Sequence, residues 1–349
     1  MWLIFNRLQP LHRCVPEFCA IVNRPKNDCL IFVEFMRSSF ARMRTSNKNL
    51  VVVGLWESAI NRFWRGFSQT SFLRNLRFAN IADMPLVQAN HLVKTFHTEQ
   101  SAFGRRPAGH VRAVNDVSLT IEAGETLGLV GESGSGKSTL GRMLLRLVEA
   151  DSGEVLFDGQ DVLRAGQEQL RLLRRDMQII FQDPFGSLDP RMTVETIVCE
   201  PLAIHGGEDG RSRRQRAVEL MRAVGLDESA LRRYPHEFSG GQRQRIGIAR
   251  ALVLRPRFIV ADEPVSALDV SVGAQIVNLL KQLQREFQLT YLFISHSMPI
   301  VRYLADRIAV MQHGELVEIG TTEHITTAAT HPYTRTLLAA TPEMEISSH

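Results

Sequence analysis

The sequence is poor in cysteine, which argues against two common ways of stabilising a protein. Four cysteines among 349 residues do not make a disulfide framework for a chain of this length. Cys14, Cys19 and Cys29 lack the paired close spacing of zinc ligands, and Cys199 stands alone. We therefore expect free thiols in a reducing cytosol.

Long apolar runs are absent as well. A helix that spans a bilayer needs about 20 apolar residues, whereas the runs at residues 30–35 and 50–56 are short and flanked by charge. The apolar start of the chain has no basic stretch before it and is soon interrupted by Arg7, so we expect no signal peptide. If the protein works at a membrane, it does so by docking on another component.

The net charge of +4 hides an uneven distribution. Residues 1–83 carry 12 Lys and Arg against 5 Asp and Glu, whereas residues 84–349 carry 29 against 32. All three Trp and nine of the 18 Phe also lie in the first 83 residues. Because the larger part is not basic, we expect no nucleic-acid partner.

Residues 1–83 show no sustained helical or strand period, and strand-like alternation begins only at Met84. Two interpretations of this segment compete. It is either a basic, aromatic extension that lies on a membrane surface, or a translated leader upstream of a native start at Met84. We favour the leader as a hypothesis, and we predict one folded domain over residues 84–349.

From residue 84 onward, short apolar runs alternate with amphipathic helical patterns. The runs at residues 126–130, 258–261 and 291–294 are typical of buried parallel strands. Apolar residues at helical spacing occupy residues 140–148 and 272–287. The alternation predicts an α/β fold with a mostly parallel sheet covered on both faces. Residues from about 185 to 255 are rich in helical pattern and in Arg, which indicates a helical insertion.

One loop fits the phosphate-binding pattern G-x-x-x-x-G-K-[ST] at every required position. Its glycines let successive N–H groups point at phosphate oxygens, and the helix that follows directs its positive end at the same anion. Lys137 reaches the outer phosphates, and the Ser138 hydroxyl is a ligand for Mg²⁺. The residues expected to hold the nucleotide are Gly131, Glu132, Ser133, Gly134, Ser135, Gly136, Lys137, Ser138 and Thr139. Alone, the motif leaves kinases, GTPases and many ATPases open.

Two acidic residues end the apolar run that starts at Phe258. We assign Asp262 to the metal and Glu263 to the general base that activates water. Two acids at a solvated strand end are common, but Pro264 and the sequence Ser-Ala-Leu-Asp at 266–269 follow here, which weakens that alternative.

A Ser-Gly-Gly turn before a helix that runs through residues 246–253 makes a second candidate anion site. By itself this turn could be an ordinary helix cap. In a chain that already has a phosphate loop and an acidic strand end, it is the discriminating feature. Its residues are Ser239, Gly240, Gly241 and Gln242.

Together these motifs resemble the ATP-binding-cassette (ABC) ATPases, with Phe238 in place of the leading Leu of the signature L-S-G-G-Q. The resemblance covers about residues 84–340. It implies a P-loop NTPase core with a small antiparallel β subdomain and a helical signature subdomain. Gln182 matches the glutamine that senses the γ-phosphate and Mg²⁺, His296 the switch histidine, and Asp269 the loop that communicates across the dimer. Phe96 is the candidate for stacking on adenine, and an unrelated core Phe is the alternative.

The same resemblance implies a mechanism. Two such domains pair head to tail, so that each ATP lies between the Lys137 loop of one subunit and the Ser239 turn of the other. ATP binding closes the pair, and hydrolysis through Glu263 and water reopens it, with differential contacts to ATP and ADP supplying the energy.

Two further stretches are similar to the bacterial oligopeptide/dipeptide (peptide/nickel) importer ATPases. These are the segment at residues 181–194 and the sequence His-Pro-Tyr-Thr-Arg-Thr-Leu-Leu at 331–338, within a tail at about 320–340. The similarity implies a peripheral subunit on the cytoplasmic face of the inner membrane. Its partners are membrane-spanning permease subunits, a second ABC ATPase, identical or paralogous, and indirectly a periplasmic or surface solute-binding protein. The alternatives are a nickel or glutathione importer, a soluble ABC ATPase outside transport, and a P-loop kinase, which leaves Ser239–Gln242 unexplained.

Overall fold

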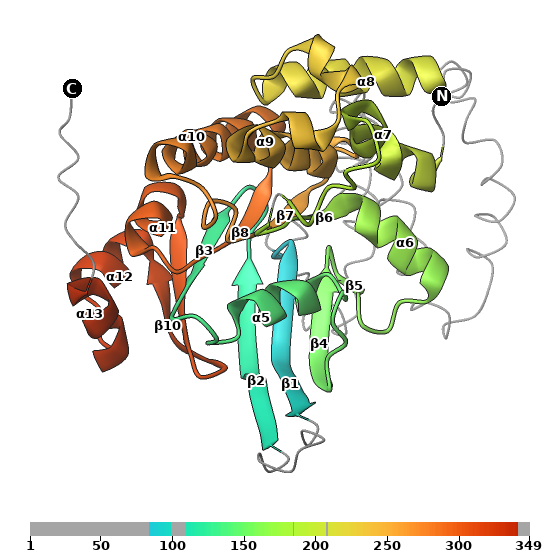
Figure 1. Ribbon diagram of the computed structural model, residues 1–349. Helices are drawn as coiled ribbons and strands as arrows, with labels where there is room; N and C mark the ends of the chain where they lie inside the picture. The colour runs from blue at the N-terminus through green and yellow to red at the C-terminus, as the bar shows by residue number, and fades with distance from the viewer. Residues whose placement is uncertain (1–83, 99–108, 184, 207–208, 341–349) are drawn as a thin grey trace, which may run out of the picture. The chain divides into compact units, whose positions relative to one another are not determined.

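The structure is a computed structural model that describes residues 84–98, 109–183, 185–206 and 209–340 (Figure 1). The extension predicted at residues 1–83, with its three cysteines, lies outside the described residues. Residues Ala79–His349 form one compact unit, and the elements below all belong to it.

A six-stranded sheet is the centre of this unit, with the order β10-β9-β3-β8-β7-β6. The five strands from β9 to β6 run parallel, and β10 pairs with β9 antiparallel at the edge. The three strands expected from apolar runs are all present, each within one residue of its predicted ends. The strands are β3 (Thr126–Val130), β6 (Met177–Ile180), β7 (Phe258–Asp262), β8 (Thr290–Ser295), β9 (Arg307–Gln312) and β10 (Glu315–Thr321).

A smaller antiparallel sheet has the order β2-β1-β4-β5. Its long strands β1 and β2 form a ladder with register shifts in its middle, and β4 pairs with the other side of β1. These strands are β1 (Val87–Thr98), β2 (Gly109–Ile121), β4 (Ser152–Phe157) and β5 (Gln160–Asp161). The mostly parallel sheet with a separate antiparallel sheet confirms the predicted fold class.

Helices cover both faces of the parallel sheet (Figure 1). The helical insertion contains α7 (Val194–His205), α8 (Gly210–Ala223), two short 3₁₀ helices, η4 (Glu228–Arg232) and η5 (Pro235–Glu237), and α9 (Gly240–Leu252). The other helices are α5 (Lys137–Leu144), α6 (Gln167–Asp176), α10 (Val270–Phe287), α11 (Met298–Leu304), α12 (Thr322–Thr327) and α13 (Pro332–Ala339).

Alternate residues of the parallel strands belong to two separate hydrophobic cores. In β7, Ile259 and Ala261 pack with the helical insertion, whereas Phe258 and Val260 pack with α5 and the antiparallel sheet. Successive side chains of a strand point to opposite faces, so a sheet that is covered on both faces must be apolar at every position. This is why these strands appear in the sequence as continuous apolar runs.

One predicted helix was too long. The apolar pattern placed Leu147 and Val148 in the helix after the phosphate loop, but α5 ends at Leu144 and Leu147 is exposed. The chain turns at Arg146, whose φ of 49° is left-handed, and the Leu147 N–H returns to the Arg142 carbonyl. This is the hydrogen-bond pattern that closes a helix C-terminus, and it ends the helix although the apolar spacing continues.

Candidate nucleotide-binding site

The predicted site residues follow four neighbouring strands of the parallel sheet. The phosphate loop begins after β3, His296 follows β8, Glu263 follows β7, and Gln182 lies two residues after β6. Since β3, β8, β7 and β6 are adjacent and parallel, their carboxyl ends meet at one edge. That edge is where ligands bind in open α/β sheets.

The phosphate loop requires glycine at two positions for close approach as well as for conformation. Gly136 has a φ of 106°, and a Cβ placed there would lie 2.0 Å from the Ala113 carbonyl oxygen of β2. Gly131 has a φ of 154°, and its Cβ would lie 2.1 Å from the Met311 carbonyl oxygen. Gly136 is also the N-cap of α5 and offers no side-chain cap, so the amide groups of the first turn are available to an anion.

The side chain of Lys137 is buried in the mouth of this loop. Its Nζ donates hydrogen bonds to the carbonyl oxygens of Gly131, at 2.8 Å, and Glu132, at 2.7 Å, and approaches Ser135 Oγ at 3.3 Å. Burial lowers the pKa of Lys137, while the carboxylates of Glu263, Asp262 and Glu132 act in the opposite direction. The loop therefore holds a desolvated ammonium group where the phosphates of a nucleotide would lie.

Asp262 is fully buried between two residues of α5. Ser138 Oγ donates a hydrogen bond to Asp262 Oδ1 at 2.6 Å, and Arg142 Nη2 lies 3.2 Å from Asp262 Oδ2. The predicted metal ligands Ser138 and Asp262 are therefore brought together from positions 124 residues apart. Sequence reasoning missed Arg142, because its partner is known only once α5 is packed against β7.

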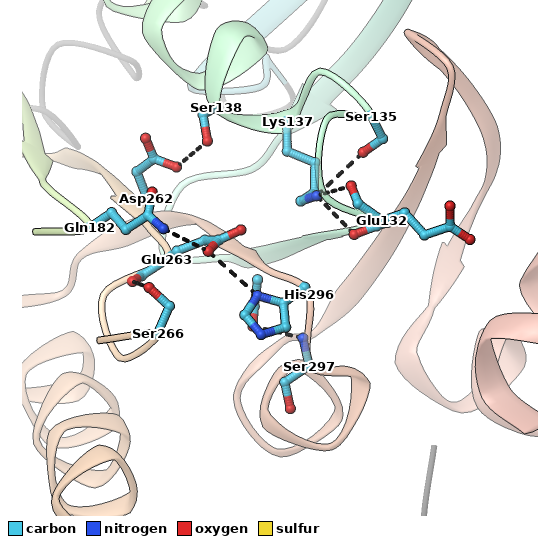
Figure 2. Close-up of polar contacts among 12 residues, drawn as sticks. Glu132, Ser135, Lys137, Ser138, Gln182, Asp262, Glu263, Ser266, His296 and Ser297 are labelled. Carbon is cyan, nitrogen blue, oxygen red and sulfur yellow. Dashed lines mark hydrogen bonds and ion pairs between the residues drawn. The ribbon is translucent and has the colours of Figure 1, made fainter. Parts of the chain in front are cut away.

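Gln182 and His296 both contact the same carboxylate oxygen of Glu263 (Figure 2). Gln182 Nε2 donates to Glu263 Oε2 at 3.1 Å, and His296 Nδ1 lies 3.4 Å from the same oxygen. The Glu263 backbone has a φ of 46°, a left-handed conformation that costs a non-glycine residue about 1–2 kcal/mol. Its N–H still bonds the Ile294 carbonyl of β8, and its carbonyl accepts from Ser266 Oγ, so neighbours on both sides hold the strained residue.

These residues surround a cavity of about 520 Å³ at the sheet edge. Its lining includes predicted residues from the phosphate loop and the strand ends, and three that were not predicted as site residues: Ser266, Ala267 and Leu337. Ser266 and Ala267 stand next to the acidic pair in the sequence. Leu337 comes from α13, and no local pattern ties it to a nucleotide.

The Ser239 turn lies away from this cavity. Ser239 caps α9 in a reciprocal pair: Gln242 N–H bonds Ser239 Oγ at 3.4 Å, and Ser239 N–H bonds Gln242 Oε1 at 3.1 Å. Gly240 and Gly241 begin the helix, and the cavity lining includes none of these four residues. Within one chain, the two candidate anion sites are therefore separate.

The helix that begins at the Ser239 turn is tied to the segment after β6. Arg250 Nη1 of α9 donates to the Ser187 carbonyl at 2.6 Å, and the Arg243 guanidinium stacks 4.3 Å above the Phe185 ring. Phe185 remains largely exposed beside Gly240. The sequence that follows Gln182 thus contacts the Ser239 turn and its helix.

Phe96 lies on β1 of the antiparallel sheet with 42% of its surface exposed. It faces Val111 of β2 across the ladder, two residues from Ala113, whose carbonyl contacts the phosphate loop. An exposed ring near the loop does not fit the alternative of a core phenylalanine. Its stacking on adenine stays a prediction.

Comparison with known proteins shows the family of this chain. A family model described as ABC transporter matches residues 114–266. The oligopeptide transport ATP-binding protein OppF of Bacillus subtilis (strain 168) is 54% identical over 259 residues, which are 74% of this chain and 82% of OppF. The chain belongs to the ABC transporter family.

Other relatives support the same assignment. The glutathione import ATP-binding protein GsiA of Salmonella choleraesuis (strain SC-B67) is 53% identical over 267 residues, which are 76% of this chain but only 42% of GsiA. The dimeric structure of the ATP-binding cassette MJ0796 bound to ADP and Pi is 32% identical, with a TM-score of 0.60, and covers 68% of this chain and 98% of its own. The expected resemblance to the peptide/nickel importer ATPases is confirmed, and the chain carries an ABC ATPase domain whose nucleotide is ATP. Among the described residues, no helix has the length and apolarity that crossing a membrane requires.

Proposed function

We propose that this chain is the ATP-hydrolysing subunit of an import system for di- or oligopeptides. The observation that carries the proposal is the 54% identity to an oligopeptide transport ATP-binding protein over 82% of that protein's length. The contacts of Gln182 and His296 with Glu263, the residues that we assign to ATP turnover, support the proposal. Transport of glutathione, the cargo named for GsiA, is the second candidate because of the 53% identity to that protein.

Glu263 is the residue that we assign to activating water. Its Oε2 accepts from Gln182 and faces His296, so Oε1 is the oxygen assigned to the attacking water. We assign the γ-phosphate contacts to His296, whose side chain is 57% exposed, and to Lys137. Gln182 then reports the state of the γ-phosphate, because it contacts the same carboxylate that acts on the water.

The residues around Asp262 fit a Mg²⁺ ion that is shared with the nucleotide. Among the described residues, no three His, Cys, Asp or Glu side chains are grouped to hold a metal by themselves. Mg²⁺ usually keeps several waters and takes one or two carboxylates beside the phosphates. Ser138 Oγ, Asp262 Oδ1 and the side-chain oxygen of Gln182 would supply this partial set. The ion would neutralise charge on the phosphates, while Lys137 and the α5 amide groups orient them.

The second half of the site comes from another subunit in this proposal. The Ser239 turn lies outside its own chain's cavity, and the related MJ0796 cassette has a dimeric structure. A head-to-tail pair would place the Ser239 turn of each subunit over the phosphate loop of the other. The second subunit is an identical copy or a related ATPase.

In this proposal the chain reaches the membrane by binding to permease subunits at the cytoplasmic face of the inner membrane. The exposed ring of Phe185, which is 55% accessible, offers them an apolar contact beside the segment that Arg250 holds. A solute-binding protein outside the membrane would deliver the cargo. The chain itself would be a peripheral subunit.

The test is uptake in cells of the source organism from which the gene has been deleted. We expect uptake of a labelled tripeptide to fall and to return with the wild-type gene but not with Lys137→Ala. Wild-type and variant chains should both co-purify with two polytopic subunits from the membrane fraction. If peptide uptake is unchanged and uptake of glutathione or nickel is lost, the lost solute is the cargo in place of peptides. Unchanged uptake of all three would refute the transport role.

A further inference from the structure

The C-terminal helix α13 contacts the phosphate loop. Tyr333 Oη accepts a hydrogen bond from the Glu132 N–H at 3.1 Å, across 201 residues of sequence. Leu337, one helical turn later on the same face of α13, lines the cavity beside Glu132 and Ser133. The helix lies at the edge of the unit next to β10 (Figure 1).

The start of α13 is fixed to the sheet by one carboxylate. Glu318 of β10 accepts hydrogen bonds from Thr330 N–H at 2.7 Å, Thr330 Oγ1 at 2.9 Å and His331 N–H at 3.2 Å. His331 caps α13, and Arg335 ties the preceding turn through the carbonyls of residues 329 and 330. Tyr333 is therefore held in place by contacts that do not involve the phosphate loop.

Tyr333 and Lys137 act on the same peptide group. The carbonyl of Gly131 accepts from Lys137 Nζ at 2.8 Å, and the N–H of the same Gly131–Glu132 peptide donates to Tyr333. In a trans peptide these two groups point in opposite directions. Tyr333 holds the N–H end of this peptide and Lys137 holds the carbonyl end, so together they fix the orientation of the peptide plane. The position of the Lys137 ammonium therefore depends on that orientation.

We propose that Tyr333 is a positioning residue that holds the Gly131–Glu132 peptide and, through it, the Lys137 ammonium in the orientation that binds phosphate. The C-terminal helix then sets the affinity of the phosphate loop for nucleotide. The inference rests on the proposed phosphate-binding role of the loop. Among the described residues, no hydrogen bond joins Tyr333 to Glu263 or His296, so we expect it to act on nucleotide affinity and not on the hydrolytic step.

Tyr333→Phe tests this role in the full chain, because it removes only the hydroxyl and keeps the ring that packs against the core. Tyr303→Phe is the matched control: Tyr303 donates its own hydroxyl to Asn278 Oδ1 at 2.8 Å on the α10–α11 surface. Without nucleotide, we expect hydrogen exchange of the Glu132 amide to rise in Tyr333→Phe alone. The Kd for ADP and the KM for ATP should rise about threefold to tenfold, the effect of one hydrogen bond, with kcat within about twofold.

Three outcomes would overturn the proposal: unchanged Glu132 exchange together with unchanged KM, an equal change in Tyr303→Phe, or a lower KM, which would make Tyr333 an obstructing contact. The exchange measurement needs no nucleotide, so it separates this inference from the proposed function. A chain that binds no ADP as wild type would refute the proposed site, whereas normal ADP binding with no effect of Tyr333→Phe would refute only the role of the tail.

Discussion

Replacing Glu263 with Gln tests the hydrolytic assignment most directly. The substitution keeps the size of the side chain and its hydrogen-bonding reach to Gln182, which lies at 3.1 Å, but removes the group that can accept a proton from water. General-base catalysis contributes about 10²- to 10⁴-fold in rate, which is about 3–5 kcal/mol of activation free energy. We therefore expect kcat to fall by at least about 100-fold.

ATP binding should survive this change. Glu263, Asp262 and Glu132 place three carboxylates near Lys137, in a site that must accept the negative charge of a triphosphate. Removing one of them lowers the repulsion of the incoming nucleotide, so the Kd for ATP should stay the same or decrease. With hydrolysis blocked, an ATP-bound dimer should also accumulate.

The assay is single-turnover hydrolysis with the protein in excess, together with ATP titration and size-exclusion chromatography of the same samples. Glu219→Gln on α8 is the matched control, because that carboxylate is exposed, accepts a 3.4 Å contact from Gln215 and is not part of the proposed site. A Glu263→Gln chain that hydrolyses ATP within threefold of wild type refutes the assignment of the base. Loss of ATP binding in the variant would contradict the electrostatic argument.

Three predictions concern stability and are read from thermal unfolding. Partial burial acts to raise the pKa of Glu318, but the hydrogen bonds from Thr330 and from the His331 N–H outweigh it and lower this pKa from an ordinary 4.5 to about 2. The stabilisation by Glu318 should therefore be full above pH 4.5 and disappear toward pH 2. Allowing for solvent screening, Glu318→Gln should cost about 1 kcal/mol at neutral pH, and an unchanged Tm contradicts this. Tyr291→Phe should stabilise by about 1 kcal/mol, because among the described residues its buried hydroxyl has no partner, and a lower Tm would indicate a bound water. Gln288→Gly should also add about 1 kcal/mol, because Gln288 ends α10 with a left-handed φ of 54°, and a lower Tm would show that its side chain contributes more than this strain costs.

Local sequence patterns predicted three strands of the parallel sheet, β3, β7 and β8, because these strands are buried on both faces. All five residues of β3 are buried, and a short run with no charged residue stands out in a chain with 22% charged residues. The phosphate loop was equally evident, because glycine is required wherever a Cβ would strike a neighbouring backbone, as at Gly131 and Gly136.

Contacts between distant segments could not be predicted in this way. The pairing of Arg142 with Asp262 and of Tyr333 with Glu132 depends on how α5 and α13 pack, and no periodicity records it. The end of α5 was misjudged for a related reason. Apolar spacing continues through Leu147, but the left-handed turn at Arg146 is stabilised by its side chain, whose Nη1 donates to the Ala165 carbonyl at 2.6 Å.

The phosphate loop is held from behind by separate parts of the chain. Gly136 lies against β2, and Ser135 accepts a hydrogen bond from the Gly314 N–H in the β9–β10 turn at 3.0 Å. Tyr333 adds a third support at Glu132. Because three separate segments contact this loop, we do not expect it to be the part that moves when ATP is converted to ADP.

The segment after β6 is better suited to that movement. Gln182 touches the carboxylate assigned to hydrolysis, and five residues later the Ser187 carbonyl accepts a hydrogen bond from Arg250 of α9. A shift of Gln182 would therefore reach the helix that begins at the Ser239 turn, which in the proposed head-to-tail pair would complete the site of the other subunit. For this reason we expect the moving part of the cycle to include Gln182 and Ser187, which contact the hydrolytic carboxylate and α9 respectively.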